Sequence, residues 1–235
     1  MSKSGSAEDA PNAQYSLLPT DSLSIRIATR VREQMFAQFA DELRPRPDDM
    51  ALDVGVTSDQ DYSSSNYFER LYPYRDHVTA CGLDDARFLE AEYPGMRYVH
   101  GNALDLPFED NAFDLVHSSA VIEHVGSFEN QRRMLAECLR VARRGICITT
   151  PNRWFPIEFH TQLPLVHWLP KPMGRRIMRG IGLDFFAREE NLNLLTRREL
   201  REMARRHPDW QFRIVTPRLL GWVSNLVLIA ERRQA

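Results

Sequence analysis

Small and polar residues follow three short apolar segments of the sequence, where they could bind a nucleoside. Gly55 closes the apolar run MALDVG, and a glycine at the end of a strand lets a ligand approach the backbone closely. Asp84 ends the next apolar run, where a carboxylate can accept both hydroxyl groups of a ribose. Asn102 follows a third run and offers a donor and an acceptor to the edge of a base. Taken singly, each residue also fits an ordinary turn or a solvated loop, so only their combination favours a binding site.

The elements that would position these residues are buried strands that alternate with helical segments. Apolar runs predict five strands, at residues 50–55, 77–83, 96–100, 113–118 and 145–150. Between the last two runs, residues 129–143 carry apolar side chains at helical spacing. This alternation predicts a parallel sheet with crossover helices, and segments 211–216 and 225–230 add an antiparallel hairpin. The expected fold class is therefore α/β, with a doubly wound, seven-stranded, mostly parallel sheet and an antiparallel C-terminal strand.

The rest of the chain divides into a tail, a helix and a cap. Residues 1–20 are polar, lack the apolar core of a signal peptide and are expected to form a disordered tail. Apolar residues at every fourth position predict a helix over 21–43, which the prolines of RPRPDD end. Residues 21–235 are expected to form a single domain with a cap insertion at about 153–191, rich in proline, aromatic residues and arginine. A capping box, TRRE at 196–199, predicts the start of a further helix.

Composition and charge exclude several classes of protein. The 235 residues are 43% hydrophobic and 26% charged, which excludes collagen, coiled coils and wholesale disorder. No segment approaches the ~20 apolar residues of a membrane-spanning helix. The three cysteines show neither paired nor metal-ligand spacing, so we expect no metal and a reducing, cytoplasmic location. Residues 1–125 carry 10 basic and 22 acidic side chains, and residues 126–235 carry 20 and 10. This asymmetry fits either an anionic ligand of the basic half or attraction between the two halves.

The segment HGNALDLPFEDNAFDLVHSSAVIEHV carries the most specific motif. Together with LDVGVTSD and ACGLDD, it resembles the class I S-adenosylmethionine (SAM) dependent methyltransferases, especially the small-molecule branch that includes quinone-biosynthesis methyltransferases. The resemblance covers about residues 52–150, and LPFEDNAFDLV followed by IEHV is its most characteristic part. It implies a Rossmann-like methyltransferase fold, SAM as the cofactor, and transfer of a methyl group to a small-molecule or lipid-like acceptor.

The resemblance assigns the first two strand ends to particular parts of SAM. Asp53 and Gly55 would hold the methionine end, and Asp84 would accept the hydroxyl groups of the ribose. The family loop usually reads acidic-x-Gly-x-Gly-x-Gly, but Thr57 and Asp59 stand here at the second and third glycines. Their side chains narrow the approach to the backbone, and the Thr57 hydroxyl becomes a candidate contact.

The next two strand ends are assigned in the same way. Asn102 and Ala103 would meet the adenine, although the family usually has aspartate at the position of Asn102. Ser118 and Ser119 would line the floor of the site beside the methionine moiety. A nicotinamide-binding Rossmann domain is the alternative with this fold, but it needs G-x-G-x-x-G, which GVTSDQ does not supply. The alternative outside enzymes is a SAM-binding but catalytically silent regulatory or scaffold protein, because the two loop glycines are missing.

Two histidines are candidates for catalysis. Methyl transfer from SAM needs a base only where the acceptor loses a proton, as a hydroxyl does. His124 in IEHV and His160 in TPNRWFPIEFHT both follow predicted strands, at the expected carboxyl side of the sheet. Each has a structural alternative, since His124 could cap a neighbouring segment and His160 could brace the cap against Glu158.

The predicted cap combines aromatic, apolar and cationic residues. Arg153, Trp154 and Phe155 could line an apolar acceptor pocket or simply hold the loop in place. The segment LPLVHWLP beside clustered cations fits an acceptor with an apolar tail and an anionic head, or transient contact with an anionic membrane surface; we favour the acceptor. Arginines at 175–179 and 197–206 come without a nucleic-acid-binding signature, so no nucleic-acid partner is expected. The sequence leaves the oligomeric state open.

Overall fold

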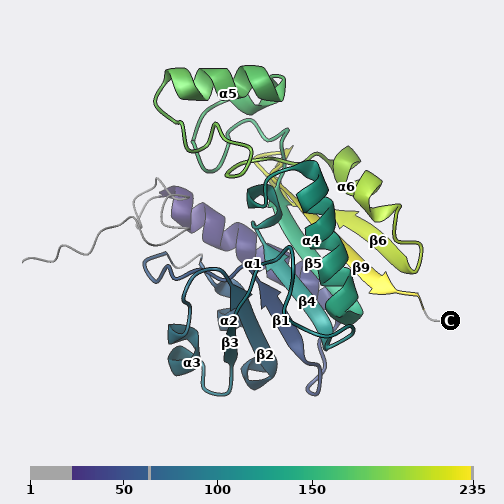
Figure 1. Ribbon diagram of the computed structural model, residues 1–235. Helices are drawn as coiled ribbons and strands as arrows, with labels where there is room; N and C mark the ends of the chain where they lie inside the picture. Colours follow the sequence, from purple (N-terminus) through teal and green to yellow (C-terminus); the bar gives the residue numbers. More distant parts are fainter. Residues whose placement is uncertain (1–22, 63–64, 234–235) are drawn as a thin grey trace, which may run out of the picture.

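The computed structural model describes residues 23–62 and 65–233, and its centre is a seven-stranded sheet (Figure 1). The strands are β1 (Ala51–Val54), β2 (Val78–Gly82), β3 (Arg97–His100), β4 (Phe113–Ser119), β5 (Ala142–Pro151), β6 (Trp210–Val215) and β9 (Asn225–Arg232). Their order is β3-β2-β1-β4-β5-β9-β6. The first five strands are parallel, whereas β9 is antiparallel to both β5 and β6. The predicted fold class is confirmed, and the strand order switches between β1 and β4, where ligands bind in such sheets.

Helices cover both faces of the sheet. The helices that do so are α1 (Leu23–Leu43), α2 (Tyr67–Leu71), α3 (Phe88–Glu92), α4 (Phe128–Val141) and α6 (Arg197–Ala204). A further helix, α5 (Lys171–Gly180), lies away from the sheet, in the segment between β5 and α6. One face packs against α1, α2 and α3 through side chains such as Phe39 and Phe68. The opposite face packs against α4 and α6 through side chains such as Met134 and Leu200. Parallel strands need this double cover, because both of their faces are apolar.

Most element boundaries agree with the patterns in the sequence. The helix predicted over 21–43 is α1; its first two residues and the tail predicted for 1–20 lie outside the described residues. The helix predicted over 129–143 ends earlier, at Val141, because the chain becomes extended at Ala142 and continues directly as β5. The predicted capping box is present, since Thr196 accepts from the backbone N–H of Glu199 at the start of α6.

The segment between β5 and α6 forms a cap beyond the end of β5, with α5 as its outermost element (Figure 1). The cap also contains the short 3-10 helix η3 (Val166–Trp168). It has a small hydrophobic core of its own, made of Met178, Phe186, Ala187, Leu192 and Leu194. The cap is thus a folded unit and not an open loop. Among the helices of residues 23–62 and 65–233, none has the length and apolar composition needed to span a membrane.

Candidate active site

The loop after β1 is closed by hydrogen bonds to neighbouring side chains. The backbone N–H of Thr57 donates to Asn66 Oδ1 (3.0 Å), and Asn66 Nδ2 donates to the carbonyl oxygen of Thr57 (2.9 Å). At the end of β2, Asp84 Oδ2 accepts from the hydroxyl groups of Thr57 and Ser58, each at 3.3 Å. Asp84 is only 2% exposed. Its carboxylate therefore already accepts two hydroxyl groups, the same kind of donor that a ribose presents.

Gly55 is required by the backbone and by packing. Its φ of +98° lies in the left-handed region, which a residue with a side chain rarely adopts. A Cβ atom at this position would lie 2.1 Å from Cγ2 of Val121, a residue of the loop after β4. The glycine therefore lets that loop close over the end of β1. The close approach of a ligand to its backbone, which the sequence suggested, stays a prediction.

The turn after β3 presents Asn102 near the same edge of the sheet. The preceding backbone N–H, of Gly101, donates to the carbonyl oxygen of Gly82 at the end of β2 (3.0 Å). Asn102 Oδ1 accepts from the backbone N–H of Leu104 (2.9 Å), and the residue is exposed. Ala103 is half-buried against the main core. The turn thus keeps Asn102 at the surface, where a base could reach it.

A buried network that the sequence analysis missed holds Asp53. In the parallel pairing of β1 with β4, Asp53 lies opposite His117, and His117 Nδ1 is 2.5 Å from Asp53 Oδ1. His117 Nε2 is 3.1 Å from the Tyr67 hydroxyl, and Phe68 stacks on the imidazole with ring centroids 4.3 Å apart. Burial lowers the pKa of His117 to about 3 and raises the pKa of Asp53 to about 7. A neutral imidazole therefore links Asp53 to Tyr67. Because the Asp53 carboxylate is engaged by His117, any contact of this residue with SAM would come from its backbone atoms.

The two serines at the end of β4 have different surroundings. Ser118 is fully buried, and its hydroxyl donates to the carbonyl oxygen of Val54 (2.8 Å). Its side chain is thus not available to a ligand, contrary to the role predicted for it. Ser119 is half-buried, and its hydroxyl is 2.8 Å from Oγ1 of Thr149 on β5. Of the two, Ser119 is the serine whose side chain lies near the edge of the sheet.

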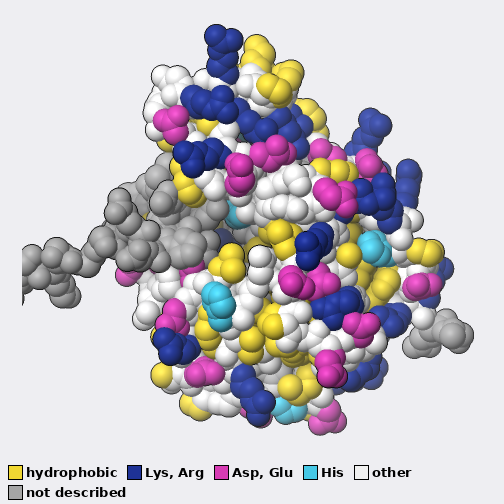
Figure 2. Space-filling model, in the orientation of Figure 1, with side chains coloured by type: hydrophobic (Ala, Val, Ile, Leu, Met, Phe, Trp, Pro, Cys, Tyr) yellow, Lys and Arg dark blue, Asp and Glu magenta, His cyan; other side chains and the backbone are white. Residues whose placement is uncertain are grey.

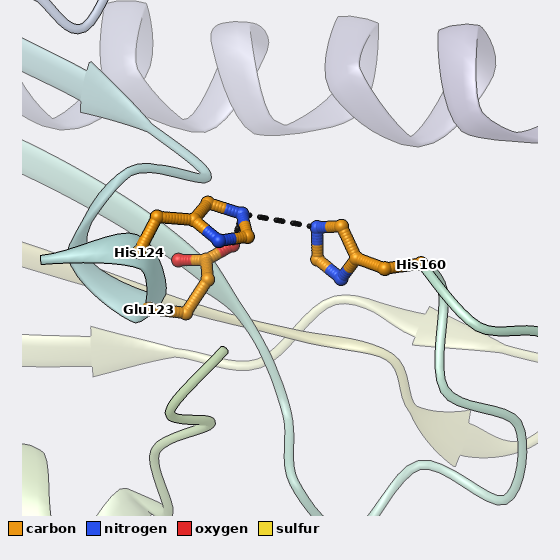
Figure 3. Close-up of side chains that lie close together, drawn as sticks. All are labelled: Glu123, His124 and His160. Carbon is orange, nitrogen blue, oxygen red and sulfur yellow. Dashed lines mark hydrogen bonds and ion pairs between the residues drawn. The ribbon is translucent and has the colours of Figure 1, made fainter. Parts of the chain in front are cut away.

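Both predicted catalytic histidines meet beyond the ends of β4 and β5 (Figure 3). His124 Nε2 and His160 Nε2 are 3.1 Å apart, and Glu123 Oε1 lies 3.9 Å from His124 Nε2. Glu123 and His124 belong to the 3-10 helix η2 (Ile122–His124), which follows β4, whereas His160 lies in the cap that follows β5. The two strands are neighbours in the sheet, and this adjacency brings the two histidines together.

Hydrogen bonds fix the orientation of both imidazole rings. His124 Nδ1 donates to the carbonyl oxygen of Asn191 (2.6 Å), and His160 Nδ1 donates to Glu158 Oε1 (2.7 Å). Burial and the charge of His160 lower the pKa of His124 to about 3. Burial would also lower the pKa of His160, but the Glu158 carboxylate outweighs burial and raises it. His160 therefore donates from Nε2 to His124 Nε2. The structural alternatives for the two histidines are also present, because His124 contacts the neighbouring segment at Asn191 and His160 contacts Glu158.

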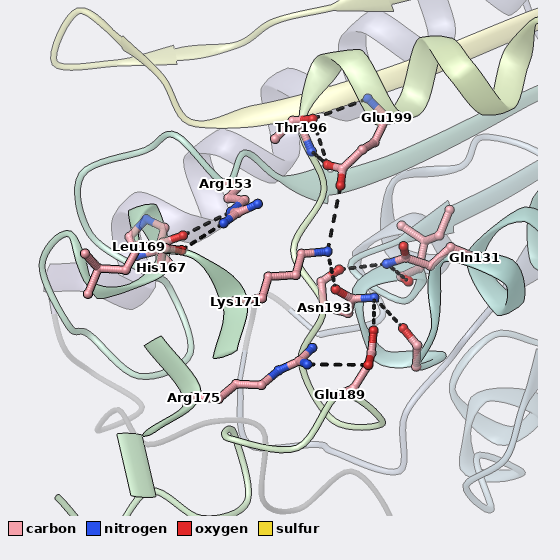
Figure 4. A network of polar contacts seen from close by, with 12 residues as sticks. Gln131, Arg153, His167, Leu169, Lys171, Arg175, Glu189, Asn193, Thr196 and Glu199 are labelled. Carbon is pink, nitrogen blue, oxygen red and sulfur yellow. Dashed lines mark hydrogen bonds and ion pairs between the residues drawn. The ribbon is translucent and has the colours of Figure 1, made fainter. Parts of the chain in front are cut away.

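The three predicted acceptor-binding residues differ in their exposure. Arg153 donates from Nε to the carbonyl oxygen of His167 (3.0 Å) and from Nη2 to that of Leu169 (2.9 Å), as Figure 4 shows. Its guanidinium also lies 5.4 Å from the ring centroid of Trp154. Phe155 is buried, whereas Trp154 is 47% exposed. Arg153 and Phe155 therefore hold the cap together, and Trp154 is the residue of the three that remains accessible.

Further polar contacts join α5 to the rest of the domain (Figure 4). Lys171 Nζ donates to Asn193 Oδ1 (2.6 Å) and lies 3.7 Å from Glu199. Arg175 Nη1 is 3.4 Å from a carboxylate oxygen of Glu189. These two cations of the cap are thus engaged inside the protein, which leaves the exposed arginines of α5 for any external partner.

Comparison with known proteins decides the family. A family model described as a methyltransferase domain matches residues 62–149, from the loop after β1 to β5. The chain thus carries a methyltransferase domain of the class I SAM-dependent type. SAM is the cofactor of this family, so the predictions of the family, the fold and the cofactor are confirmed.

Curated relatives match this methyltransferase over part of their length. Ajmaline N-methyltransferase from Rauvolfia serpentina is 31% identical over 156 residues, which cover 63% of this chain and 48% of the relative. Demethylmenaquinone methyltransferase from Symbiobacterium thermophilum is 35% identical over 86 residues, which cover 32% of this chain and 33% of the relative. The chain thus spans half or less of these relatives. Magnesium protoporphyrin IX methyltransferase from Synechocystis PCC 6803, solved with bound SAH, shares the fold with a TM-score of 0.53 at 14% identity, over 89% of this chain and 86% of that one.

The residues present at the sheet edge fit SAM. The buried Asp84 carboxylate already accepts two hydroxyl groups, and the exposed Asn102 lies one strand further along the edge. Ser119 and the backbone at Gly55 lie on the other side of Asp84, at the ends of β4 and β1. A carboxylate for the ribose, an amide for the base and a small-residue turn for the methionine end are thus arranged in the order that the cofactor requires.

Proposed function

We propose that this chain transfers a methyl group from SAM to a nucleophilic atom of a small-molecule acceptor. The observation that carries the proposal is the chain of hydrogen bonds from Glu158 through His160 to His124. It lies beyond the ends of β4 and β5, near the strand ends that the family uses for SAM. SAM supplies a methyl group activated by a sulfonium sulfur. The protein positions the acceptor in line with that methyl group and excludes water from it.

Five residues at the sheet edge are the proposed cofactor contacts. Asp84 accepts the ribose hydroxyls in place of the two side-chain hydroxyls that it now holds, one of which belongs to Thr57. Asn102 and Ala103 contact the adenine. The remaining contacts, from Ser119 and the backbone at Gly55, hold the methionine end. Asp53 and Ser118 act from inside the protein, because their side chains are bound to β4 and β1 respectively.

His124 and His160 are the proposed catalytic residues. Their Nε2 atoms lie 3.1 Å apart beside Glu123, and the cap residue Asn191 and the buried Glu158 orient the two rings. An acceptor hydroxyl or amine bound beneath the cap would meet these nitrogen atoms, which then orient it toward the methyl group. The acceptor site would be lined in addition by the exposed Trp154.

The surface of the cap supports a lipid-like acceptor. Helix α5 buries Gly174 and Met178 but exposes Met173, Ile177 and the following Ile181, at intervals of four residues. Figure 2 shows dark blue cationic side chains beside yellow apolar ones over this part of the molecule. The relative named for demethylmenaquinone also supports an apolar acceptor. An anionic headgroup, or transient contact of α5 with an anionic membrane, would suit the exposed arginines.

The test is methyl transfer from radiolabelled SAM to a panel of quinone, lipid, phenolic and amine acceptors. We expect transfer to one class, and we expect His124→Gln and His160→Gln to abolish transfer while retaining SAM binding. His207→Gln is the matched control, because His207 lies beyond the end of α6, outside the histidine pair. Failure to bind either SAM or SAH in calorimetry would refute the proposal. Binding without transfer to any acceptor would favour a catalytically silent protein.

A further inference from the structure

The potential metal-ligand atoms of Glu123, His124 and His160 lie close together (Figure 3). Their ligand atoms all lie within 4.8 Å of one another, with His124 Nε2 3.1 Å from His160 Nε2 and 3.9 Å from Glu123 Oε1. Tetrahedral ligands at the usual zinc distances are about 3.3–3.5 Å apart. A movement of Glu123 Oε1 by about 0.5 Å toward His124 Nε2 would therefore bring this pair to the separation found in a metal site.

Among the described residues, one of the two carboxylate oxygens of Glu123 has no hydrogen-bond partner. Thr150 Oγ1 donates to Glu123 Oε2 (2.8 Å), which orients the carboxylate. Glu123 Oε1 is buried and has no hydrogen-bond partner among residues 23–62 and 65–233. A buried polar atom without a hydrogen-bond partner lowers the stability of the fold, and most buried polar atoms in proteins are hydrogen-bonded or bind an ion. The free oxygen is the one that lies on the side of His124.

The hydrogen bonds behind the two histidines are those of metal-binding imidazoles. A metal-ligating histidine usually donates its other ring N–H to a carbonyl or a carboxylate. His124 Nδ1 donates to the carbonyl oxygen of Asn191, and His160 Nδ1 donates to Glu158. Glu158 is held in turn by the backbone N–H of Thr161 (2.6 Å). The two Nε2 atoms are the ring nitrogens that would face a metal ion. At 3.1 Å from each other, they need either a proton or a cation between them.

We propose that Glu123, His124 and His160 bind a divalent transition-metal ion, with Zn²⁺ as the probe of choice. Two imidazoles and one carboxylate suit zinc, cobalt or iron, whereas magnesium and calcium prefer oxygen ligands alone. The described residues supply three ligands, and a site with three protein ligands has a fourth position for water or substrate, as in catalytic zinc sites. This part of the inference rests on the proposed function: the fourth position would hold the oxygen or nitrogen atom of the acceptor and orient it toward SAM.

The experiment measures metal binding by itself, without SAM or an acceptor. The purified chain is treated with EDTA, desalted, and titrated with ZnSO₄ by calorimetry and with CoCl₂ by visible absorption. We expect one ion per chain and the absorption of four-coordinate Co²⁺. His160→Gln and Glu123→Gln should each lose at least tenfold in affinity. Glu158→Gln, which alters only the support of His160, should lose about 10- to 100-fold.

His207→Gln is the matched histidine control and should bind metal as the wild type does. SAM binding of each variant serves as the test of folding, since no proposed cofactor contact is replaced. The proposal is overturned if the wild type binds no ion, or if it binds one that the folded His160→Gln, Glu123→Gln and Glu158→Gln variants bind equally well. Metal binding without methyl transfer to any acceptor would support the metal site and refute the proposed function. Methyl transfer without metal binding would support the proposed function and refute the metal site.

Discussion

Replacement of Asp84 by asparagine tests the ribose site most directly. Asp84 accepts from the hydroxyls of Thr57 and Ser58 and from the Ser58 N–H, all at 3.3 Å, near the long end of the range for hydrogen bonds. Asparagine keeps the shape and one acceptor, so the free energy of unfolding should fall by less than about 1 kcal/mol. Hydrogen bonds from ribose hydroxyls to a carboxylate are worth ~1.5–3 kcal/mol. The affinity for SAM should therefore fall about 10- to 150-fold.

Calorimetric titration with SAM and SAH measures the affinity, and urea unfolding measures the stability. Asp85→Asn is the matched control, because Asp85 is adjacent but exposed and paired with Arg87 at 2.5 Å. This control should bind SAM as the wild type does. An unchanged affinity in folded Asp84→Asn protein would show that the ribose lies elsewhere. An equal loss of SAM affinity in Asp84→Asn and Asp85→Asn would show that the change depends on net charge and not on a contact with the ribose.

Three other variants test the loop, the cap and the surface of α5. Gly55→Ala should destabilise the fold by about 1–3 kcal/mol in urea unfolding, because of its positive φ and the overlap with Val121; Val121→Ala should restore only part of this, and a neutral Gly55→Ala would contradict it. Arg153→Gln should lower stability by about 1–3 kcal/mol through its two lost carbonyl contacts and leave SAM affinity unchanged, whereas a raised KM for the acceptor at unchanged stability would indicate a substrate contact. Arg176→Glu/Arg179→Glu should abolish sedimentation with anionic vesicles at low salt, since each cation contributes up to ~1 kcal/mol; equal sedimentation of the wild type with anionic and neutral vesicles would exclude a role of these cations in membrane contact.

Features that depend on neighbouring residues in the chain could be predicted from the sequence. Strands are short apolar runs, α1 follows from apolar residues at every fourth position, and the capping box at Thr196 needs only residues three apart. The family could also be recognised, because its motifs are continuous strings that end successive strands. Asp84 and Asn102 could be proposed as cofactor contacts for the same reason, since each comes at the end of an apolar run.

Features that depend on how strands pair could not be predicted in this way. His117 was read as part of an apolar strand, yet it meets Asp53, 64 residues away, because the two are cross-strand neighbours in register. The same pairing buries the Ser118 hydroxyl, which donates to the carbonyl oxygen of Val54.

The histidine pair shows the same division between sequence and tertiary structure. His124 and His160 could be selected individually because each follows a strand, but their 3.1 Å contact exists only because β4 and β5 lie side by side. Glu123 was not predicted as a site residue, because in the sequence it is only one letter of the motif IEHV. The prediction that the protein binds no metal rested on the spacing of the cysteines alone. By itself, the sequence determined the local elements, the family and the cofactor, since these depend on short-range patterns. Tertiary structure alone decided which polar groups are buried together, because burial and contact depend on the register of strands that are distant in the chain.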